Sequence, residues 1–261
     1  MARQSSWPVP PAHPVATGPN SREGVRNMSL TPAFAFFDVD ETLITEKSMF
    51  SMLHEIEKHL GGINASDIKH RLQTMAKAGE ARAEVNLAYY RALAGLPCCE
   101  VQQIAADYIS KRLQTDTMAP YLIQPVVTQL RRLQSNGITP VFLSGSAVDF
   151  LIPLADHLNV SHILATQLKV DKAGHYTGEI VSQPMIGDGK RQALINFASQ
   201  HQSPLSDCYA FGDHSSDAEY LSLVGMARIV SGNSQLEQQA QQQGWPIIQR
   251  PEATPLPLAT V

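Results

Sequence analysis

Two carboxylates stand two positions apart directly after a short apolar run near the start of the chain. The run ends at Phe37, and Asp38 and Asp40 follow it within a D-x-D-x-T pattern that closes at Thr42. In open α/β sheets, ligands bind outside the carboxyl ends of the strands, so both carboxylates stand where a ligand is expected. One of them can attack phosphorus and hold a divalent cation while the other handles a proton. A single match of this kind is also common among solvated turn residues, so other residues of the chain are needed to show whether it marks an active site.

Two further segments could bind an anion. Ser144 and Gly145 follow the apolar run at 139–143. A hydroxyl and nearby backbone N–H groups at this place can hold an oxyanion. Both residue types are also ordinary in turns and helix caps. Lys190 stands at the start of a predicted helix. A lysine is better placed near a helix C-terminus, so this position indicates a shared anionic target, with a surface lysine as the alternative.

A second pair of carboxylates follows the apolar run at 208–211. Mg²⁺ prefers oxygen ligands and takes only a few carboxylates, and Asp213 is the better candidate because it is nearest the strand. Asp217 could hold a metal-bound water or orient Lys190, or it could cap a helix. We interpret His214 as a neighbouring or surface histidine and not as a catalytic base.

The elements that must position these residues are predicted from hydrophobic periodicity. Short apolar runs are typical of strands buried on both faces, and they alternate with helical patterns, which predicts a parallel sheet with right-handed crossovers. The predicted strands are 33–37, 139–143, 208–211, 226–230 and 246–248; the predicted helices are 121–135, 148–157, 190–200, 216–223 and 235–243. The predicted fold class is therefore α/β with a Rossmann-like core.

Two stretches depart from this alternation. Residues 47–119 carry about four helical patterns and no strand pattern, which predicts a helical cap inserted after the first strand. Residues 167–170 and 176–181 flank a glycine-containing turn, which predicts a β-hairpin before Lys190. The predicted organisation is a flexible leader at 1–30, a core at 31–46 and 120–250, a cap at 47–119 and a flexible tail at 251–261.

Composition excludes several classes of protein. The 261-residue chain has 20 Lys plus Arg against 24 Asp plus Glu, so we expect no nucleic-acid surface, which is usually basic. It has no run of about 18 apolar residues, so we expect no integral membrane segment. Three cysteines, two of them neighbours, suggest neither disulfides nor a zinc site, and we expect a cytoplasmic protein.

The four polar segments together resemble the motifs of the haloacid dehalogenase (HAD) superfamily. The matches are the D-x-D-x-T segment from Asp38, then Ser144, Lys190, and the Gly-Asp-x-x-x-Asp segment ending at Asp217. A helical insertion between the first two motifs resembles subclass IB, the phosphoserine-phosphatase-like branch. An aspartate at the position of Asp40 accompanies phosphatase chemistry in this superfamily, whereas dehalogenases usually lack it.

The resemblance implies a Mg²⁺-dependent phosphatase that acts on a small-molecule phosphomonoester through an aspartyl-phosphate on Asp38, with Asp40 as general acid and then base. The resemblance also implies that Mg²⁺ is bound by the carboxylates of Asp38 and Asp213 and by the backbone carbonyl of Asp40. It implies that phosphate is bound by the backbone N–H groups of Val39, Asp40 and Gly145 together with Ser144 and Lys190. Thr42 and Asp217 would support these residues. The alternatives are a phosphotransferase with an alcohol acceptor, a phosphoserine phosphatase specifically, and a non-catalytic module that binds phospho-ligands.

The substrate is left open by one departure from the family pattern. Phosphoserine phosphatases have a glutamate nine residues after the nucleophile to hold the substrate ammonium, and here that position is Lys47. Tyr89 falls near the place of the arginine that holds the substrate carboxylate, with Arg91 two residues away. We therefore expect Lys47, Tyr89 and Arg91 to shape specificity, and a leaving group that tolerates or uses a positive charge, such as a sugar, a polyol, a lipid headgroup or a compound with a second phosphate.

Overall fold

A six-stranded parallel sheet forms the centre of the computed structural model, which describes residues 33–114 and 120–250. The strand order is β3-β2-β1-β6-β7-β8. The strands are β1 (Phe34–Phe37), β2 (Thr139–Ala147), β3 (His162–Thr166), β6 (Tyr209–Gly212), β7 (Met226–Val230) and β8 (Ile247–Ile248). Because β1 pairs in parallel with both β2 and β6, the carboxyl ends of these three strands meet at one edge of the sheet.

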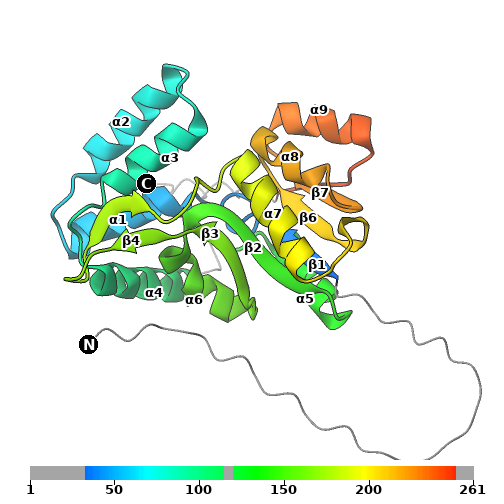
Figure 1. The fold of residues 1–261 in the computed structure, drawn as a ribbon, viewed down its shortest axis with the longest axis horizontal. Coiled ribbons are helices and arrows are strands. Elements are labelled where there is room, and N and C mark those ends of the chain that lie inside the picture. Colours follow the sequence, from blue (N-terminus) through cyan, green and yellow to red (C-terminus); the bar gives the residue numbers. More distant parts are fainter. Residues whose placement is uncertain (1–32, 115–119, 251–261) are drawn as a thin grey trace, which may run out of the picture. The chain divides into compact units, whose positions relative to one another are not determined.

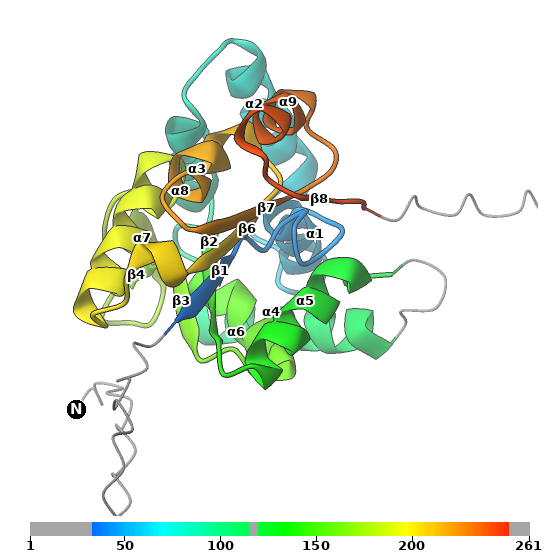
Figure 2. The same ribbon diagram turned by 90° about the vertical axis from the view of Figure 1, so that its right-hand side faces the viewer.

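Helices cover both faces of this sheet, as Figure 2 shows. On one face α5 (Gln124–Ser135) and α6 (Val148–Leu158) bury leucines and valines against β1 and β2. The other face is covered by α7 (Asp188–Gln200), α8 (Ala218–Leu221) and α9 (Ser234–Gln243). The predicted α/β class is confirmed.

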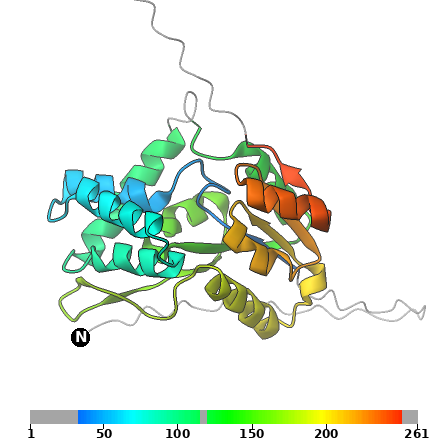
Figure 3. The same cartoon turned by 90° about the horizontal axis from the view of Figure 1, so that it is seen from above.

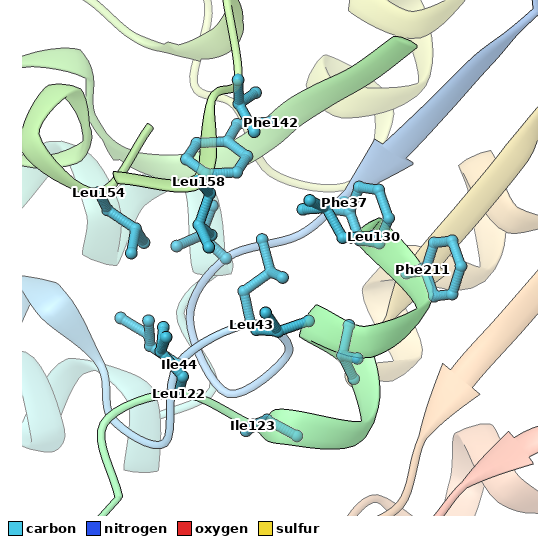
Figure 4. Close-up of a cluster of buried hydrophobic side chains, with 14 of the residues drawn as sticks. Phe37, Leu43, Ile44, Leu122, Ile123, Leu130, Phe142, Leu154, Leu158 and Phe211 are labelled. Atoms are coloured by element: carbon cyan, nitrogen blue, oxygen red, sulfur yellow. The ribbon is translucent and has the colours of Figure 1, made fainter. Parts of the chain in front are cut away.

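The loop that follows β1 is anchored in the hydrophobic core. Leu43 and Ile44 are fully buried, and the backbone N–H of Ile123 donates to the carbonyl oxygen of Leu43 at 2.8 Å. Figure 4 shows Leu43 and Ile44 among the core side chains with Ile123 beside them, while the rings of Phe37 and Phe211 stack at 4.3 Å between centroids. This packing fixes both the strand before Asp38 and the loop after it.

Among the described residues between β1 and α5 there are four helices, and they gather beside the sheet in Figure 1. They are α1 (Ser48–His59), α2 (Ala65–Lys77), α3 (Arg82–Arg91) and α4 (Cys98–Gln114). Their apolar faces form a separate core that also includes Phe150 at the start of α6. The helical cap that the sequence predicts is therefore observed as an inserted group of helices.

The predicted hairpin consists of β4 (Leu168–Val170) and β5 (Tyr176–Ile180), and it packs against the inserted helices. The backbone N–H of Gly95 donates to the carbonyl oxygen of Tyr176 at 2.8 Å. A Cβ atom on Gly178 would lie 3.2 Å from Cα of Arg91, and Gly178 has φ +81°, so this position requires glycine. Figure 3 shows the hairpin beneath the cap helices.

The structure also differs from the prediction in three places. The edge strand β3 was not predicted, β2 continues to Ala147 past the predicted end at Leu143, and the predicted helix at 216–223 is a 3₁₀ turn (Ser215–Asp217) followed by the short α8. The predicted leader at 1–30, the predicted tail at 251–261 and the end of the cap at 115–119 lie outside the described residues. Within the described ranges, no helix is both long and apolar enough to cross a bilayer.

Candidate active site

Asp38 begins the site at the carboxyl end of β1. Its backbone N–H donates to the carbonyl oxygen of Phe211 at 3.0 Å, which ties the ends of β1 and β6 together. Asp38, Ser144 and Asp213 line one pocket, so the residues that follow β1 and β6 and the end of β2 do converge. This agrees with the expectation that ligands bind outside the carboxyl ends of parallel strands.

Lys190 reaches the same point from the first turn of α7. Its Nζ lies 2.9 Å from Oδ1 of Asp38 and 2.9 Å from Oδ1 of Asp217, and the side chain is 5% exposed. Burial opposes the charged ammonium, but Asp217 and Asp38 outweigh it and raise the pKa of Lys190. The lysine is therefore a permanent positive charge in contact with the first carboxylate.

Three buried carboxylates crowd around this lysine. Oxygen atoms of Asp38, Asp213 and Asp217 lie within 4.8 Å of one another. Burial raises the pKa of Asp38 well above its usual range and that of Asp213 to about 6, and neighbouring carboxylates add to both shifts. Such a set of hard oxygen donors with surplus negative charge fits Mg²⁺. Thr42 donates to Oδ1 of Asp213 at 3.1 Å and orients this carboxylate.

Asp40 has different partners from Asp38, although the two are close in sequence. Its Oδ1 accepts from the backbone N–H of Ser48 at 3.2 Å, and its Oδ2 accepts from Oγ of Ser146 at 2.9 Å. The two serine hydroxyls contact each other at 2.7 Å. Burial raises the pKa of Asp40 despite these hydrogen bonds, so it keeps a proton to higher pH than an exposed aspartate would.

The peptide at Gly145 is fixed by three donors from two elements, α3 and β3. Its carbonyl oxygen accepts from Tyr90 Oη at 2.7 Å, Thr166 Oγ1 at 2.9 Å and Asn86 Nδ2 at 3.3 Å. A Cβ atom on Gly145 would lie 2.7 Å from Cδ1 of Ile186 and 3.3 Å from the backbone carbonyl oxygen of Met185, so a side chain here would make Ile186 shift. The hydrogen bonds to its carbonyl oxygen hold the backbone in place beside Ser144.

The pocket opens between the core and the inserted helices. Lys47 and Arg82 line it together with Glu41, and Lys47 Nζ lies 3.2 Å from Oε2 of Glu41. His214 also lines the pocket, and burial, followed by the nearby Arg82, lowers its pKa, which favours the neutral imidazole.

The family model for haloacid dehalogenase-like hydrolases matches residues 35–222. The chain belongs to this family. It is thus a hydrolase of the HAD type, as the sequence motifs predicted.

The chain is also similar to curated proteins and to a solved structure. The chain is 29% identical to the inhibition of morphological differentiation protein of Streptomyces azureus, over 87% of this chain and 81% of that one. It is 27% identical to a phosphoserine phosphatase, SerB1, of Mycobacterium tuberculosis, over 94% of this chain and 79% of that one. A phosphoserine phosphatase solved with a phospho-aspartyl intermediate analogue has the same fold, with a TM-score of 0.60 and 16% identity over 83% of this chain and 92% of that one.

Not every residue predicted for this HAD site lines the pocket. The side chain of Val39 is buried in the core. Tyr89 is fully buried in the cap and donates to the carbonyl oxygen of Met49 at 2.9 Å, and the exposed Arg91 is also absent from the pocket wall. An ungapped match cannot follow the rotation of α3, which turns its first residue, Arg82, toward the pocket instead.

Several residues of the site were not predicted from the sequence. Ser48, Tyr90, Asn86 and Thr166 were not among the predicted site residues. The contacts of the first three depend on how the cap meets the core, whereas Thr166 lies on the unpredicted strand β3. Arg250 was also missed: it donates to the backbone carbonyl of Glu41 and lies 3.7 Å from Oδ2 of Asp213. One departure from the family pattern did point to unusual partners at this site: Ser146 stands where the family usually has a glycine.

Proposed function

We propose that this chain is a Mg²⁺-dependent phosphatase, a phosphoric monoester hydrolase that acts on a small molecule through an aspartyl-phosphate on Asp38. The observation that carries the proposal is the contact of the buried Lys190 ammonium with Asp38, next to Asp213 and Asp217. This contact supports the proposal because a carboxylate, a fixed cation and an oxygen-donor cluster line one pocket. The HAD family and a relative named as a phosphoserine phosphatase support the same chemistry.

In the first step, an Asp38 carboxylate oxygen attacks phosphorus, and the bond from phosphorus to the ester oxygen breaks. Asp40 gives its proton to the departing oxygen, so the leaving group departs as an alcohol. The raised pKa of Asp40 supports this role, because the group must be protonated before the reaction. Its separate hydrogen bonds to Ser48 and Ser146 keep it apart from the carboxylate cluster.

In the second step, Asp40 takes a proton from water, and the water oxygen attacks the phosphorus of the aspartyl-phosphate. Inorganic phosphate leaves and Asp38 returns as a carboxylate, so one difficult displacement becomes two easier ones. Lys190, the Ser144 hydroxyl and the backbone N–H groups of Val39, Asp40 and Gly145 hold the phosphoryl oxygens throughout. Positioning and charge stabilisation of this kind dominate phosphoryl transfer.

The carboxylates of Asp38 and Asp213 and the backbone carbonyl of Asp40 would hold Mg²⁺, which neutralises charge on the phosphate and orients it. Asp217 instead engages Lys190, and its Oδ2 accepts from the backbone N–H of His214 at 3.2 Å. We assign it the role of orienting the lysine and the loop that carries Asp213.

The test measures phosphate release from a broad panel of phosphate esters with Mg²⁺. Asp38→Asn should lose at least about 1,000-fold in kcat, since it lacks the nucleophile. The matched control is Asp156→Asn, an exposed aspartate on α6 outside the pocket, which should retain full activity. Acid quenching during turnover should trap covalent phosphate on the wild type and none on Asp38→Asn.

Asp38→Asn turning over at the wild-type rate would refute the proposal. Transfer of phosphate to an added alcohol in preference to water would instead identify a phosphotransferase that uses the same intermediate.

A further inference from the structure

Arg82 places a guanidinium at the mouth of the catalytic pocket. It is the first residue of α3, its side chain is exposed, and it lines the same pocket as Asp38, Ser144 and Lys190. Nη1 of Arg82 contacts Nδ1 of His214 and lies 3.0 Å from Oγ of Ser216, both on the loop after β6. The arginine therefore crosses from the inserted helices to the core and is held over the opening.

The other two cations of the pocket already have carboxylate partners. Lys190 contacts Asp38 and Asp217, and Lys47 contacts Glu41. Arg82 differs from both: among the residues that the structure describes, no carboxylate forms an ion pair with it. Within the described part of the chain, its positive charge is the one among these three cations that no carboxylate neutralises.

The partners of Arg82 supply lone pairs but no negative charge. Nδ1 of His214 accepts a hydrogen bond from the backbone N–H of Ser216 at 3.1 Å, so this nitrogen is the unprotonated one. The Ser216 hydroxyl is neutral as well. A guanidinium has five donors in a planar fork, and the contacts to His214 and Ser216 use one nitrogen of it. The rest of the fork can receive a ligand.

We propose that Arg82 forms a subsite for a second anionic group, so that the substrate is a phosphate monoester whose leaving group carries a carboxylate or a second phosphate. This inference rests on the proposed phosphatase function. The phosphate that reacts is held at Lys190 in the depth of the pocket, and its leaving group extends toward the mouth, where Arg82 lies. Arginine binds carboxylate and phosphate in a bidentate manner, and a guanidinium held in place beforehand loses little freedom on binding.

The experiment compares substrates that differ in this second charge. One pair is glycerol 3-phosphate and 3-phosphoglycerate, in which a neutral CH₂OH is exchanged for a carboxylate. The other pair is 3-hydroxypropyl phosphate and propane-1,3-diyl bisphosphate, whose two phosphates are equivalent. Values of kcat and KM are measured with Mg²⁺ for the wild type, Arg82→Gln, Arg82→Lys and the control Arg71→Gln. Arg71 is an exposed arginine on α2 that does not line the pocket.

The wild type should prefer the doubly anionic member of at least one pair. Arg82→Gln should lower kcat/KM for that member by about 10- to 100-fold, mainly through KM, which is the usual range for hydrogen bonds to charged groups. The singly anionic member should change by less than about 3-fold, Arg82→Lys should recover part of the loss, and Arg71→Gln should behave as the wild type. A loss confined to one pair identifies whether carboxylate or phosphate is the group that is bound.

An equal loss on both members of each pair would show that Arg82 only fastens the cap to the core, and no loss on either member would show that it binds nothing. Both results overturn this inference and leave the phosphatase function standing. Absence of phosphate release by the wild type across the whole panel would instead refute the proposed function, and the subsite with it.

Discussion

Asp40 is held by two serines that come from different parts of the fold. Ser48 starts the first inserted helix, whereas Ser146 lies at the end of β2, and their hydroxyls contact each other. Both are buried, at 5% and 1% exposure, so solvent does not compete for these hydrogen bonds. The position of the proposed proton donor therefore depends on both parts of the fold.

Replacement of Ser146 by alanine should slow the chemical step without weakening substrate binding. The variant loses the donor to Oδ2 of Asp40. In the second step, when Asp40 is a carboxylate, a hydrogen bond to this charged group is worth about 1.5 kcal/mol or more, so kcat should fall by about 10-fold. KM should stay within about 2-fold, because Asp40 does not hold the phosphate in the ground state. Steady-state kinetics check this, with Ser199→Ala as control, since Ser199 is exposed on α7. An unchanged kcat would contradict the role of Ser146.

The sequence contains enough information to locate the residues that follow the strand ends, but not their partners. Asp38, Ser144, Lys190 and Asp213 all line the pocket because parallel strands end at the same edge of a sheet, which is a general rule of this fold class. Arg82 and Ser48 could not be predicted in the same way. Their place at the site depends on the docking of α1 and α3 against the core, and local periodicity does not encode that docking.

At the scale of elements, a strand is easier to predict from the sequence when both of its faces are buried. Strands β1 and β6 are covered by helices on both faces and read as continuous apolar runs. The missed strand β3 is at the edge of the sheet, pairs only with β2 among the described strands, and is half-buried along most of its length. It begins at His162, which is atypical of a strand, and no alternation distinguishes it from the loops beside it.

His162 makes the stability of this edge depend on pH. Its ring packs against Phe197 at 5.1 Å between centroids, and burial, followed by the proximity of His201, lowers its pKa below the usual 6.5. The unfolded chain then binds a proton more readily than the folded one, so stability is full above pH 6.5 and falls as the pH drops below it. His162→Phe should keep the ring contact and remove this loss. Urea unfolding at pH 8 and pH 5 tests it: the wild type should lose more stability than the variant between these values, and an equal loss would contradict the assignment.

At the scale of the whole described structure, the inserted helices and the core are joined around the pocket itself. Ser48 contacts Asp40, Tyr90 contacts Gly145, and Arg82 contacts His214. Each of these contacts runs from a cap helix to a residue beside a strand end. The pocket is therefore shaped by both parts, and changes in the cap should be felt in the chemistry.

Cation binding should couple the site to the stability of the fold. Without a cation, the carboxylates of Asp38, Asp213 and Asp217 repel one another in a buried place, with Lys190 as the neighbouring ammonium. A cation at 100 times its Kd stabilises the folded state by about 2.7 kcal/mol. For a chain of this size that corresponds to a rise in Tm of about 5–10 °C. Calorimetry with and without MgCl₂ should show this rise for the wild type.

The variant Asp213→Asn distinguishes the repulsion between the carboxylates from the binding of Mg²⁺. The amide keeps an acceptor for Thr42 but carries no charge, so the variant should have a Tm without Mg²⁺ equal to or above that of the wild type. It should also lose most of the Mg²⁺-dependent rise, because a carboxylate ligand is gone. Asp156→Asn, an exposed control, should keep the full rise. If Asp213→Asn responded to Mg²⁺ as strongly as the wild type, the cation would bind elsewhere, and the carboxylate cluster would serve only to orient Lys190.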